Sequence, residues 1–133
     1  MSEVAISIEN MFEQLPDIGP ASGESALLDG IAALERLKAA AAARQARLAV
    51  ALDSARRADE AQRGVPAVRR GRGVAAEVAL ARRDSPARGS RHLGFAKALV
   101  HEMPYTLAAL EAGVADDGAC AVRADGDVFE IDP

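Results

Sequence analysis

The 133-residue chain is poor in the residues that support metal, disulfide or redox chemistry. It has one cysteine, Cys120, two histidines and no tryptophan. An intramolecular disulfide is therefore excluded, and a cysteine-based zinc site would need other ligands that are not nearby. No apolar run approaches the roughly 18 to 20 residues that span a bilayer, and the N-terminus is acidic where a signal peptide is basic. These absences predict a cytoplasmic protein with no membrane partner.

Large side chains that fill a core are also scarce. Only four residues are aromatic, whereas 31 are alanine. Alanine is the best intrinsic helix former, and it occurs here with Leu, Glu, Arg and Gln. The composition predicts an all-α fold in which long helices form around one small, marginally stable core.

Three regions follow from the distribution of proline, glycine and charge. Residues 1–24 begin with an apolar patch and break at PDIGPASGE, which predicts a flexible arm that docks elsewhere. Residues 25–113 keep a helical period and form the helical module. Residues 114–133 are acidic and rich in glycine, and two alternatives stay open for them: disorder, or a brief strand at Val128, Phe129 and Ile131.

The helical module is expected to open with one long helix from Ala26 to about Gln62. Apolar residues recur there at intervals of three, four or seven, which places them on one stripe: Leu27, Ile31, Leu34, Ala41, Leu48, Leu52 and Ala55. A helix of this length extends on the order of 50 Å, more than a small core can cover. Part of the stripe is therefore expected to meet another helix or a second copy of the chain, which makes a homodimer through the long helix one hypothesis.

Three shorter helices are predicted after the long one, separated by turns that contain glycine or proline. The connection 63–73 cannot stay helical, and Ser85-Pro86 and Met103-Pro104 mark the later breaks. Gly113 is a plausible left-handed cap at the end. The expected helices begin at Val74 and run over roughly 87–102 and 105–112, with an apolar face that includes Val74, Val78, Ala81, Leu93, Ala96 and Val100.

Charge is separated along the chain although the formal net charge is only -4. Residues 1–35 hold seven acidic and no basic residues, and residues 98–133 hold eight acidic residues against Arg123. Between them, residues 63–97 form what we call the basic island, with Glu77 and Asp84 as its acidic residues. Its nine cations are Arg63, Arg69, Arg70, Arg72, Arg82, Arg83, Arg88, Arg91 and Lys97. Such a cluster is able to bind phosphates and predicts contact with DNA or RNA. The alternative is a solvated surface that neutralises the acidic ends of the same chain or of a dimer partner.

Other motifs give weaker signals. His101-Glu102 begins like the zinc motif H-E-x-x-H, but Tyr105 stands at the second histidine position and Pro104 interrupts the helix. Residues 71–76 have the form G-x-G-x-x-A without a convincing preceding strand, so a glycine-rich helix entry is the simpler interpretation. The acidic tail lacks the calcium-loop pattern. We therefore expect no catalytic residue, metal, cofactor or small-molecule substrate.

The stretch from Val74 to Gly113 resembles the middle of a helical module that opens many actinobacterial HNH endonucleases, the domain of unknown function 222 or thirteen-E-twelve repeat family. With the long helix included, the resemblance covers about residues 25–113. It depends on GVAAEVALARR at 73–83, Ser85-Pro86, RGSRHLG at 88–94, Ala96, Leu99, Pro104, Thr106 and AALEAG at 108–113.

The resemblance implies an all-helical module and no activity of its own. In the family an HNH nuclease motif commonly follows, but here His92 and His101 lie inside the helical module and Asn10 is the sole asparagine. The family helices expected after Gly113 are replaced by the acidic tail, which suggests a truncated or frame-shifted copy. Three hypotheses follow: a non-catalytic module of unknown role, a small DNA-associating protein, and a helical oligomerisation module or vestigial product.

Overall fold

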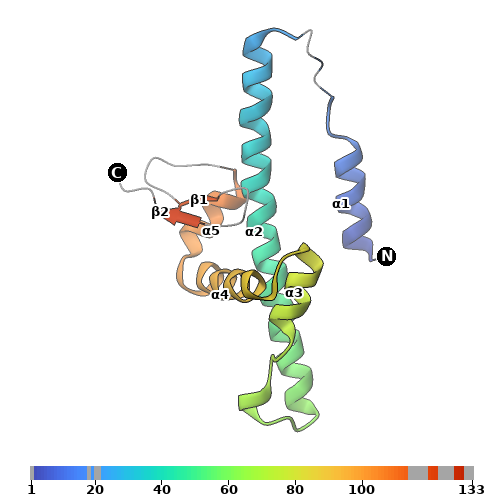
Figure 1. Cartoon of the computed structure of the whole chain (residues 1–133), viewed down its shortest axis with the longest axis vertical. Helices are drawn as coiled ribbons and strands as arrows, with labels where there is room; N and C mark the ends of the chain where they lie inside the picture. Colours follow the sequence, from blue (N-terminus) through green and yellow to red (C-terminus); the bar gives the residue numbers. More distant parts are fainter. Residues whose placement is uncertain (1, 18, 20–21, 114–119, 123–127, 131–133) are drawn as a thin grey trace. The chain divides into compact units, whose positions relative to one another are not determined.

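The computed structural model describes residues 2–17, 19, 22–113, 120–122 and 128–130. These residues form five α-helices, one short 3-10 helix and two short strands, and most of them are helical (Figure 1). The predicted all-α class, with one long helix followed by three shorter ones, is confirmed. The chain divides into two units, Met1–Leu34 and Glu35–Pro133.

The first unit contains a helix that the sequence analysis did not predict. Helix α1 spans Glu3–Glu13, inside the segment expected to be a flexible arm. Ser2 is its N-cap, and the Ser2 hydroxyl accepts a hydrogen bond of 3.2 Å from the amide of Ala5. A capping serine followed by an acidic first turn is a favourable helix start. The prolines and glycines that predicted an irregular arm lie beyond the end of this helix.

Helix α2 begins in the first unit and continues into the second. It spans Glu24–Gln62, 39 residues, and begins two residues earlier than predicted. At 1.5 Å per residue its length is roughly 60 Å. The helix is long because its sequence holds no proline and only one interior glycine, Gly30, in an alanine-rich context.

The second unit continues with the 3-10 helix η1 and three α-helices close to the predicted bounds: η1 Ala67–Arg69, α3 Val74–Arg82, α4 Pro86–Glu102 and α5 Pro104–Glu111. Each boundary has a local cause. The Ser85 hydroxyl caps α4 by accepting a hydrogen bond from the amide of Arg88, and Pro86 and Pro104 occupy the first position of their helices. Gly113 has φ +69°, as expected for a left-handed residue after a helix.

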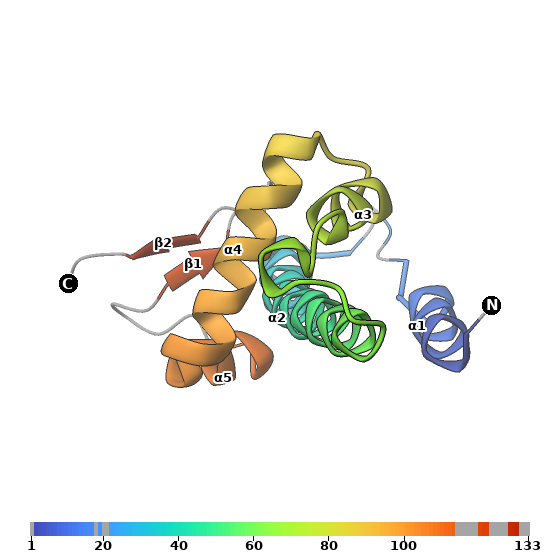
Figure 2. The ribbon, with the colours of Figure 1, turned by 90° about the horizontal axis from the view of Figure 1, so that it is seen from below.

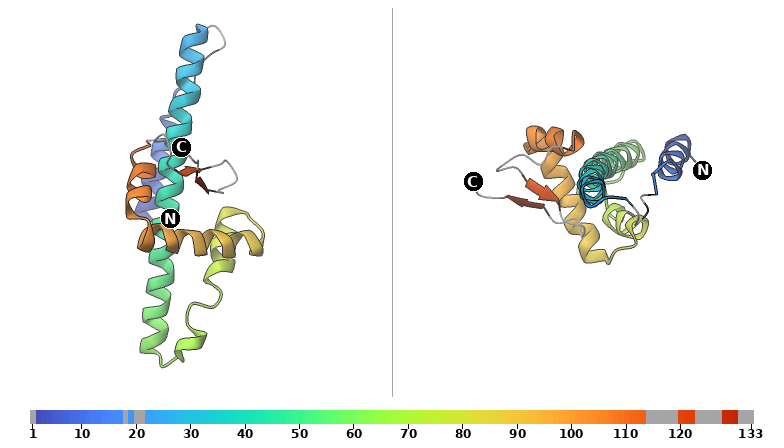
Figure 3. Two further views of the ribbon diagram at one scale, coloured as in Figure 1. Left: turned by 90° about the vertical axis from the view of Figure 1, so that its left-hand side faces the viewer. Right: turned by 90° about the horizontal axis from the view of Figure 1, so that it is seen from above.

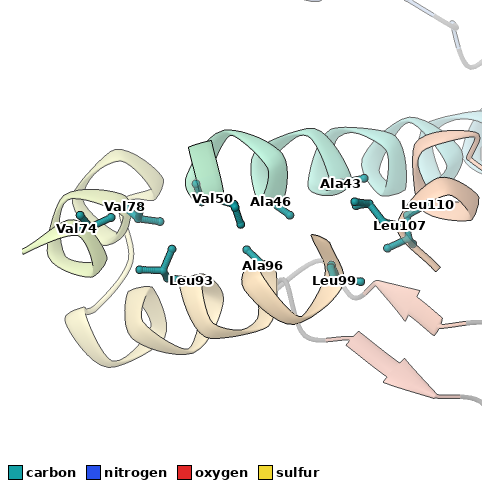
Figure 4. Packing of buried hydrophobic residues seen from close by; sticks show 11 residues of the cluster. Ala43, Ala46, Val50, Val74, Val78, Leu93, Ala96, Leu99, Leu107 and Leu110 are labelled. Carbon is teal, nitrogen blue, oxygen red and sulfur yellow. The ribbon is translucent and has the colours of Figure 1, made fainter. Parts of the chain in front are cut away.

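The core lies where α4 crosses α2. Figure 2 shows α4 lying across α2, with α3 near one end of α4 and α5 at the other, and Figure 3 shows the same crossing from two further sides. In the close view of Figure 4, Ala46 of α2 and Ala96 of α4 point toward one another. The buried cluster consists of Ala43, Ala46, Ala49, Val50, Val74, Val78, Leu93, Ala96, Leu99, Leu107 and Leu110.

The face of α2 that enters this core is not the predicted stripe. Within α2 the buried side chains are Ala43, Ala46, Ala49, Val50 and Asp53. None of the seven stripe residues is buried, and Leu48 and Leu52 are 53% and 38% exposed. The predicted stripe follows the spacing of the larger leucines. At the crossing with α4 the buried residues of α2 are mainly alanines, because small side chains let the two helices pack together. Ala81 of α3 is exposed as well, and Ala79 is buried in its place.

Two strands form near the C-terminus. Strand β1, Cys120–Val122, pairs antiparallel with β2, Val128–Glu130, so that Ala121 lies opposite Phe129. Of the residues considered for a strand, Val128 and Phe129 belong to β2, and Ile131 lies outside the described residues. The partner strand, β1, was not predicted from the sequence. The tail carboxylates Asp116, Asp117, Asp125, Asp127 and Asp132 also lie outside the described residues.

Candidate nucleic-acid interface and the exposed face of the long helix

The structure divides the basic island into cations that hold the fold together and cations that face solvent. Lys97 of α4 belongs to the first group. Its ammonium group lies 3.1 Å from Oδ2 of Asp53 on α2, and Nε of Arg57 lies 2.9 Å from the same oxygen. Asp53 is only 5% exposed. Lys97 therefore neutralises a buried carboxylate at the α2–α4 crossing and is committed to that contact.

The environment of Asp53 also determines its ionisation. Burial by itself raises the pKa of a carboxyl, but the hydrogen bonds and positive charges of Lys97 and Arg57 outweigh it and hold the pKa of Asp53 below its ordinary value. The second oxygen, Oδ1, is buried and has no hydrogen-bond partner. The negative charge of Asp53 is therefore stabilised in the core by two cations.

Arg82 and Arg88 form a second internal group at the corner between α3 and α4. Nε of each guanidinium lies 3.3 Å from one oxygen of Asp84, and Nη1 of Arg82 donates a 2.8 Å hydrogen bond to Oε1 of Gln45 on α2. The side chains of Arg82 and Asp84 are 17% and 19% exposed. Arg82 therefore connects the corner to α2 by a hydrogen bond, and its positive charge is balanced by Asp84 within the fold.

His92 completes this corner. Its Nε2 lies 3.3 Å from Nη1 of Arg82. Because a guanidinium only donates, Nε2 of His92 must accept, which requires the neutral imidazole. Burial and the nearby charge of Arg82 lower the pKa of His92 below its ordinary value, and the carboxylate of Asp84 opposes this only in part. His92 therefore acts as an acceptor inside the fold.

Arg63 and Arg70 are also engaged. Arg63 pairs with Asp59 one helical turn earlier at 3.0 Å, although both side chains are exposed. Nε of Arg70 donates a 2.9 Å hydrogen bond to the carbonyl oxygen of Val65, which closes the connection between α2 and η1. Five of the nine cations of the basic island thus have partners within the chain.

The other four cations, which we call the free arginines, face solvent. Arg69, Arg72, Arg83 and Arg91 are exposed and have no ion-pair or hydrogen-bond partner for their guanidinium groups within the described residues. Arg69 and Arg72 precede α3, Arg83 follows it and Arg91 lies in α4. A helix roughly 13 Å long therefore separates the first two from the last two. Arg83 is held in the left-handed region at φ 57°. The candidate phosphate surface is therefore smaller than the basic island that the sequence suggested.

The glycine motif at 71–76 has a structural role in this region. It follows the 3-10 helix η1 instead of a strand, and the amide of Gly71 donates a 3.0 Å hydrogen bond to Glu60 of α2. A Cβ atom on Gly71 would lie 2.6 Å from the guanidinium of Arg57. The guanidinium is the movable end of a long side chain, so glycine is favoured here mainly because the backbone of residue 71 has φ +78°, which lies in the left-handed region. The described residues contain no group of three or more His, Cys, Asp or Glu side chains placed to hold a metal ion.

A second candidate surface lies on α2, opposite the core. We define the leucine face as Leu37, Leu48 and Leu52 with Ala41 and Ala55 between and beyond them. Its three leucines are 41%, 53% and 38% exposed. Arg44 lies on this face within one helical turn of Ala41 and Leu48, is exposed, and has no ion-pair partner among the described residues. Within the first unit, Leu28, Ile31 and Leu34 of the same helix are 66%, 62% and 50% exposed.

Exposed apolar side chains in a row are uncommon on a soluble monomer and often mark an interaction site. No helix among the described residues is both long enough and apolar enough to cross a membrane. No protein-family model, curated protein or solved structure matches the chain.

Proposed function

We propose that this chain is a non-catalytic helical module that self-associates through the leucine face of α2. The observation that carries the proposal is the arrangement of apolar residues on α2, where alanines enter the chain's own core while Leu37, Leu48 and Leu52 face solvent. Burying a large aliphatic side chain contributes about 1.5–3 kcal/mol, so an exposed row of leucines favours association.

The resemblance to the N-terminal helical module of HNH endonuclease-type proteins supports the non-catalytic part of the proposal, because the residues that carry it include no nuclease motif. The single cysteine supports a reducing, cytoplasmic site of action. Cleavage of plasmid DNA by the purified chain with a divalent metal, abolished by His101→Ala, would contradict this part.

The self-association is tested by sedimentation of the full chain over about a hundredfold range of concentration. We expect the mass to rise from monomer to dimer, and Leu48→Glu with Leu52→Glu to keep the chain monomeric, because each change places a charge in the apolar contact. Ser54→Glu with Ala58→Glu is the matched control: it adds two glutamates at the same spacing, at exposed positions off the leucine face. A wild-type chain that stays monomeric throughout would refute the proposal.

The second candidate function is contact with DNA or RNA, and the observation that favours it is the set of four free arginines. Four phosphate contacts give a salt slope near -3.6, so raising salt from about 50 to about 200 mM should weaken binding on the order of a hundredfold. Fluorescence anisotropy of a labelled DNA duplex measures this directly, and a single-stranded RNA of equal length extends the test to RNA.

In this assay, pairs of variants distinguish the contribution of the free arginines from that of cations that already have ion-pair partners. Arg69→Ala with Arg72→Ala should flatten the salt slope by about two phosphate contacts. Lys38→Ala with Arg63→Ala removes the same charge from exposed side chains that already have ion-pair partners, Glu35 and Asp59, and should change binding little. Equal losses for the two pairs would mean that only net charge matters and that the free arginines form no site.

A further inference from the structure

Helices α3 and α4 are joined by a turn of only three residues. Helix α3 ends at Arg82, the turn consists of Arg83, Asp84 and Ser85, and α4 begins at Pro86. The two helices run in different directions, since Figure 2 shows α3 nearly end-on and α4 along its length. Two helices set at a wide angle by a turn of three or four residues form a helix-turn-helix unit.

The backbone of the turn ends one helix and starts the next. The amide of Asp84 donates a 2.8 Å hydrogen bond to the carbonyl oxygen of Ala79 and closes the end of α3. Arg83 has φ 57° and is the only residue other than glycine with a positive φ among those that the structure describes. A glycine adopts this conformation without strain, so an arginine here places a charged side chain in the turn at a cost in backbone strain.

Close packing holds the two helices at this angle. A Cβ atom on Gly89 of α4 would lie 2.4 Å from Cβ of Ala79 and 2.6 Å from the carbonyl oxygen of Ala75, both on α3. The backbones of α3 and α4 therefore approach each other closely at Gly89. Helix α2 completes the packing, because residues of α2, α3 and α4 share one buried cluster (Figure 4).

The side of α4 that faces away from this packing is open to solvent. Ala87, Ser90, Arg91 and Gly94 recur at intervals of three or four, which places them on one face, and all four are exposed. Helix α4 carries no acidic residue before Glu102. This face is narrow and basic, and the major groove of B-DNA, about 12 Å wide, admits an α-helix.

The free arginines belong to the same unit. Arg69 and Arg72 precede its first helix, Arg83 lies in its turn and Arg91 in its second helix. In complexes of helix-turn-helix proteins the first helix crosses the sugar-phosphate backbone, and the N-terminal part of the second contacts base edges in the major groove. The cations that the fold leaves without partners are thus in the elements that DNA contacts in such complexes.

We propose that α3, the turn and α4 form a helix-turn-helix unit that binds double-stranded DNA, with α4 in the major groove. Ser90 and Arg91 face base edges. Arg69, Arg72 and Arg83 contact phosphates. This inference rests on the second candidate function, contact with nucleic acid, and names the ligand as duplex DNA. An RNA duplex is disfavoured, because its deep and narrow major groove does not admit side chains.

The unit and the leucine face are compatible. Helix α4 packs on the alanine side of α2, and the leucine face lies on the opposite side of α2. Self-association through the leucine face therefore leaves the exposed side of α4 open in both copies, as a protein that reads two half-sites requires.

Binding of selected DNA by the full chain tests the unit. Duplexes are selected from a random-sequence pool, and anisotropy then measures their affinity. Arg91→Ala should weaken binding about tenfold or more, as expected for one good base contact. Arg83→Gly should reduce the salt slope by about one phosphate contact, while urea unfolding shows a chain at least as stable as wild type, because glycine relieves the strain. Arg36→Ala is the matched control: it removes an exposed arginine of α2 outside the unit and should change binding little.

Modified bases in the selected duplex identify the groove. Methylation of guanine at N7 and replacement of thymine by uracil alter the major-groove edge, whereas methylation of adenine at N3 alters the minor-groove edge. Every base pair contains a guanine or a thymine, so every position can be probed. Major-groove changes should weaken binding and minor-groove changes should not. Ser90→Glu, which places a carboxylate on the exposed face of α4, should abolish binding, and circular dichroism confirms that its helices are retained.

The outcomes separate this inference from the nucleic-acid contact on which it rests. Selection without an enriched sequence, interference from the minor groove alone, or tighter binding to single-stranded RNA would overturn the helix-turn-helix assignment. Unchanged binding by both Arg83→Gly and Arg91→Ala would also overturn it, and a loss with Arg69→Ala, Arg72→Ala would then leave the nucleic-acid contact standing. No binding to any probe at about 50 mM salt would overturn both proposals.

Discussion

Asp53 offers the sharpest test of how this small core is held together. Its carboxylate is buried on α2 and is neutralised by Arg57 on the same helix and Lys97 on α4. Removing one partner of a buried ion pair costs about 3–5 kcal/mol when the other charges stay buried. Here the cation side chains are 44% and 36% exposed and regain water when Asp53 is removed. We therefore expect Asp53→Ala to lower the free energy of unfolding by about 2 kcal/mol, which lowers Tm on the order of 10 °C.

The assay is thermal and urea unfolding followed by circular dichroism, with Asp59→Ala as the control. Asp59 makes the same i,i+4 pair with Arg63, but both side chains are more than 60% exposed, and such pairs contribute about 0.5 kcal/mol or less. Equal effects of Asp53→Ala and Asp59→Ala would refute the reasoning.

The ionisation of Asp53 gives the same prediction a pH dependence. Because the folded-state pKa lies below the ordinary value of 3.8, the unfolded chain binds the proton first as the pH falls. The stabilisation is therefore present above pH 3.8 and is lost as the pH falls toward the folded-state pKa. Asp53→Asn keeps the shape and removes the charge, so its stability deficit relative to wild type should shrink below about pH 4.

Two further predictions concern α4. Gly89→Ala should destabilise the chain by about 1–3 kcal/mol, because a Cβ there would lie 2.4 Å from Cβ of Ala79. Gly94→Ala in the same helix meets nothing within 4 Å and should stabilise the chain by about 0.5–1 kcal/mol. Urea unfolding of both variants measures the two effects, and effects of the same sign would contradict the close packing of α3 on α4. The pKa of His92 is lowered from its ordinary value of 6.5, so the unfolded chain binds the proton first and the free energy of unfolding should fall as the pH drops below 6.5. This pH dependence should disappear in His92→Gln. An NMR titration that places the pKa of the folded His92 above 6.5 would rule out the prediction.

The positions of the helices were predictable from sequence because their ends depend on local chemistry. Ser85-Pro86, Met103-Pro104 and Gly113 each act within one turn of the chain, and the bounds of α3, α4 and α5 follow from them. Helix α1 was not predicted because the prolines and glycines near the end of residues 1–24 indicated an irregular conformation for the whole segment. The informative signal lay earlier, in a capping serine followed by apolar residues at helical spacing.

The buried face of α2 was not predictable because tertiary packing decided it. Two stripes run along this helix at the same period, one of leucines and one of alanines, and hydrophobicity ranks the leucines first. The crossing with α4 selects the alanines because they bring Ala46 and Ala96 face to face. Asp53 lies in the same buried stripe, and nothing local in the sequence indicates that Lys97, 44 residues later, neutralises it.

The basic island was visible as a cluster, but its division into engaged and free arginines required the fold. Asp84 is one of two acidic residues in the basic island, and it pairs with two of the nine cations because the corner between α3 and α4 brings Arg82 and Arg88 to its two carboxylate oxygens. Sequence spacing indicates the Asp84–Arg88 pair, which is one helical turn, but not the hydrogen bond from Arg82 to Gln45 of α2.

The selection of alanines for the core has an energetic consequence for the whole chain. Hydrophobic stabilisation grows with apolar area removed from water, and an alanine contributes much less area than a leucine. A core whose α2 contribution is Ala43, Ala46, Ala49 and Val50 therefore gains little from the longest helix, while that helix keeps its leucines on the outside. Covering the leucine face adds the burial that the single chain lacks, and any partner that binds the folded chain alone also stabilises it by mass action. The proposed self-association would therefore link folding to assembly, because it buries leucines that α2 leaves exposed in its own fold.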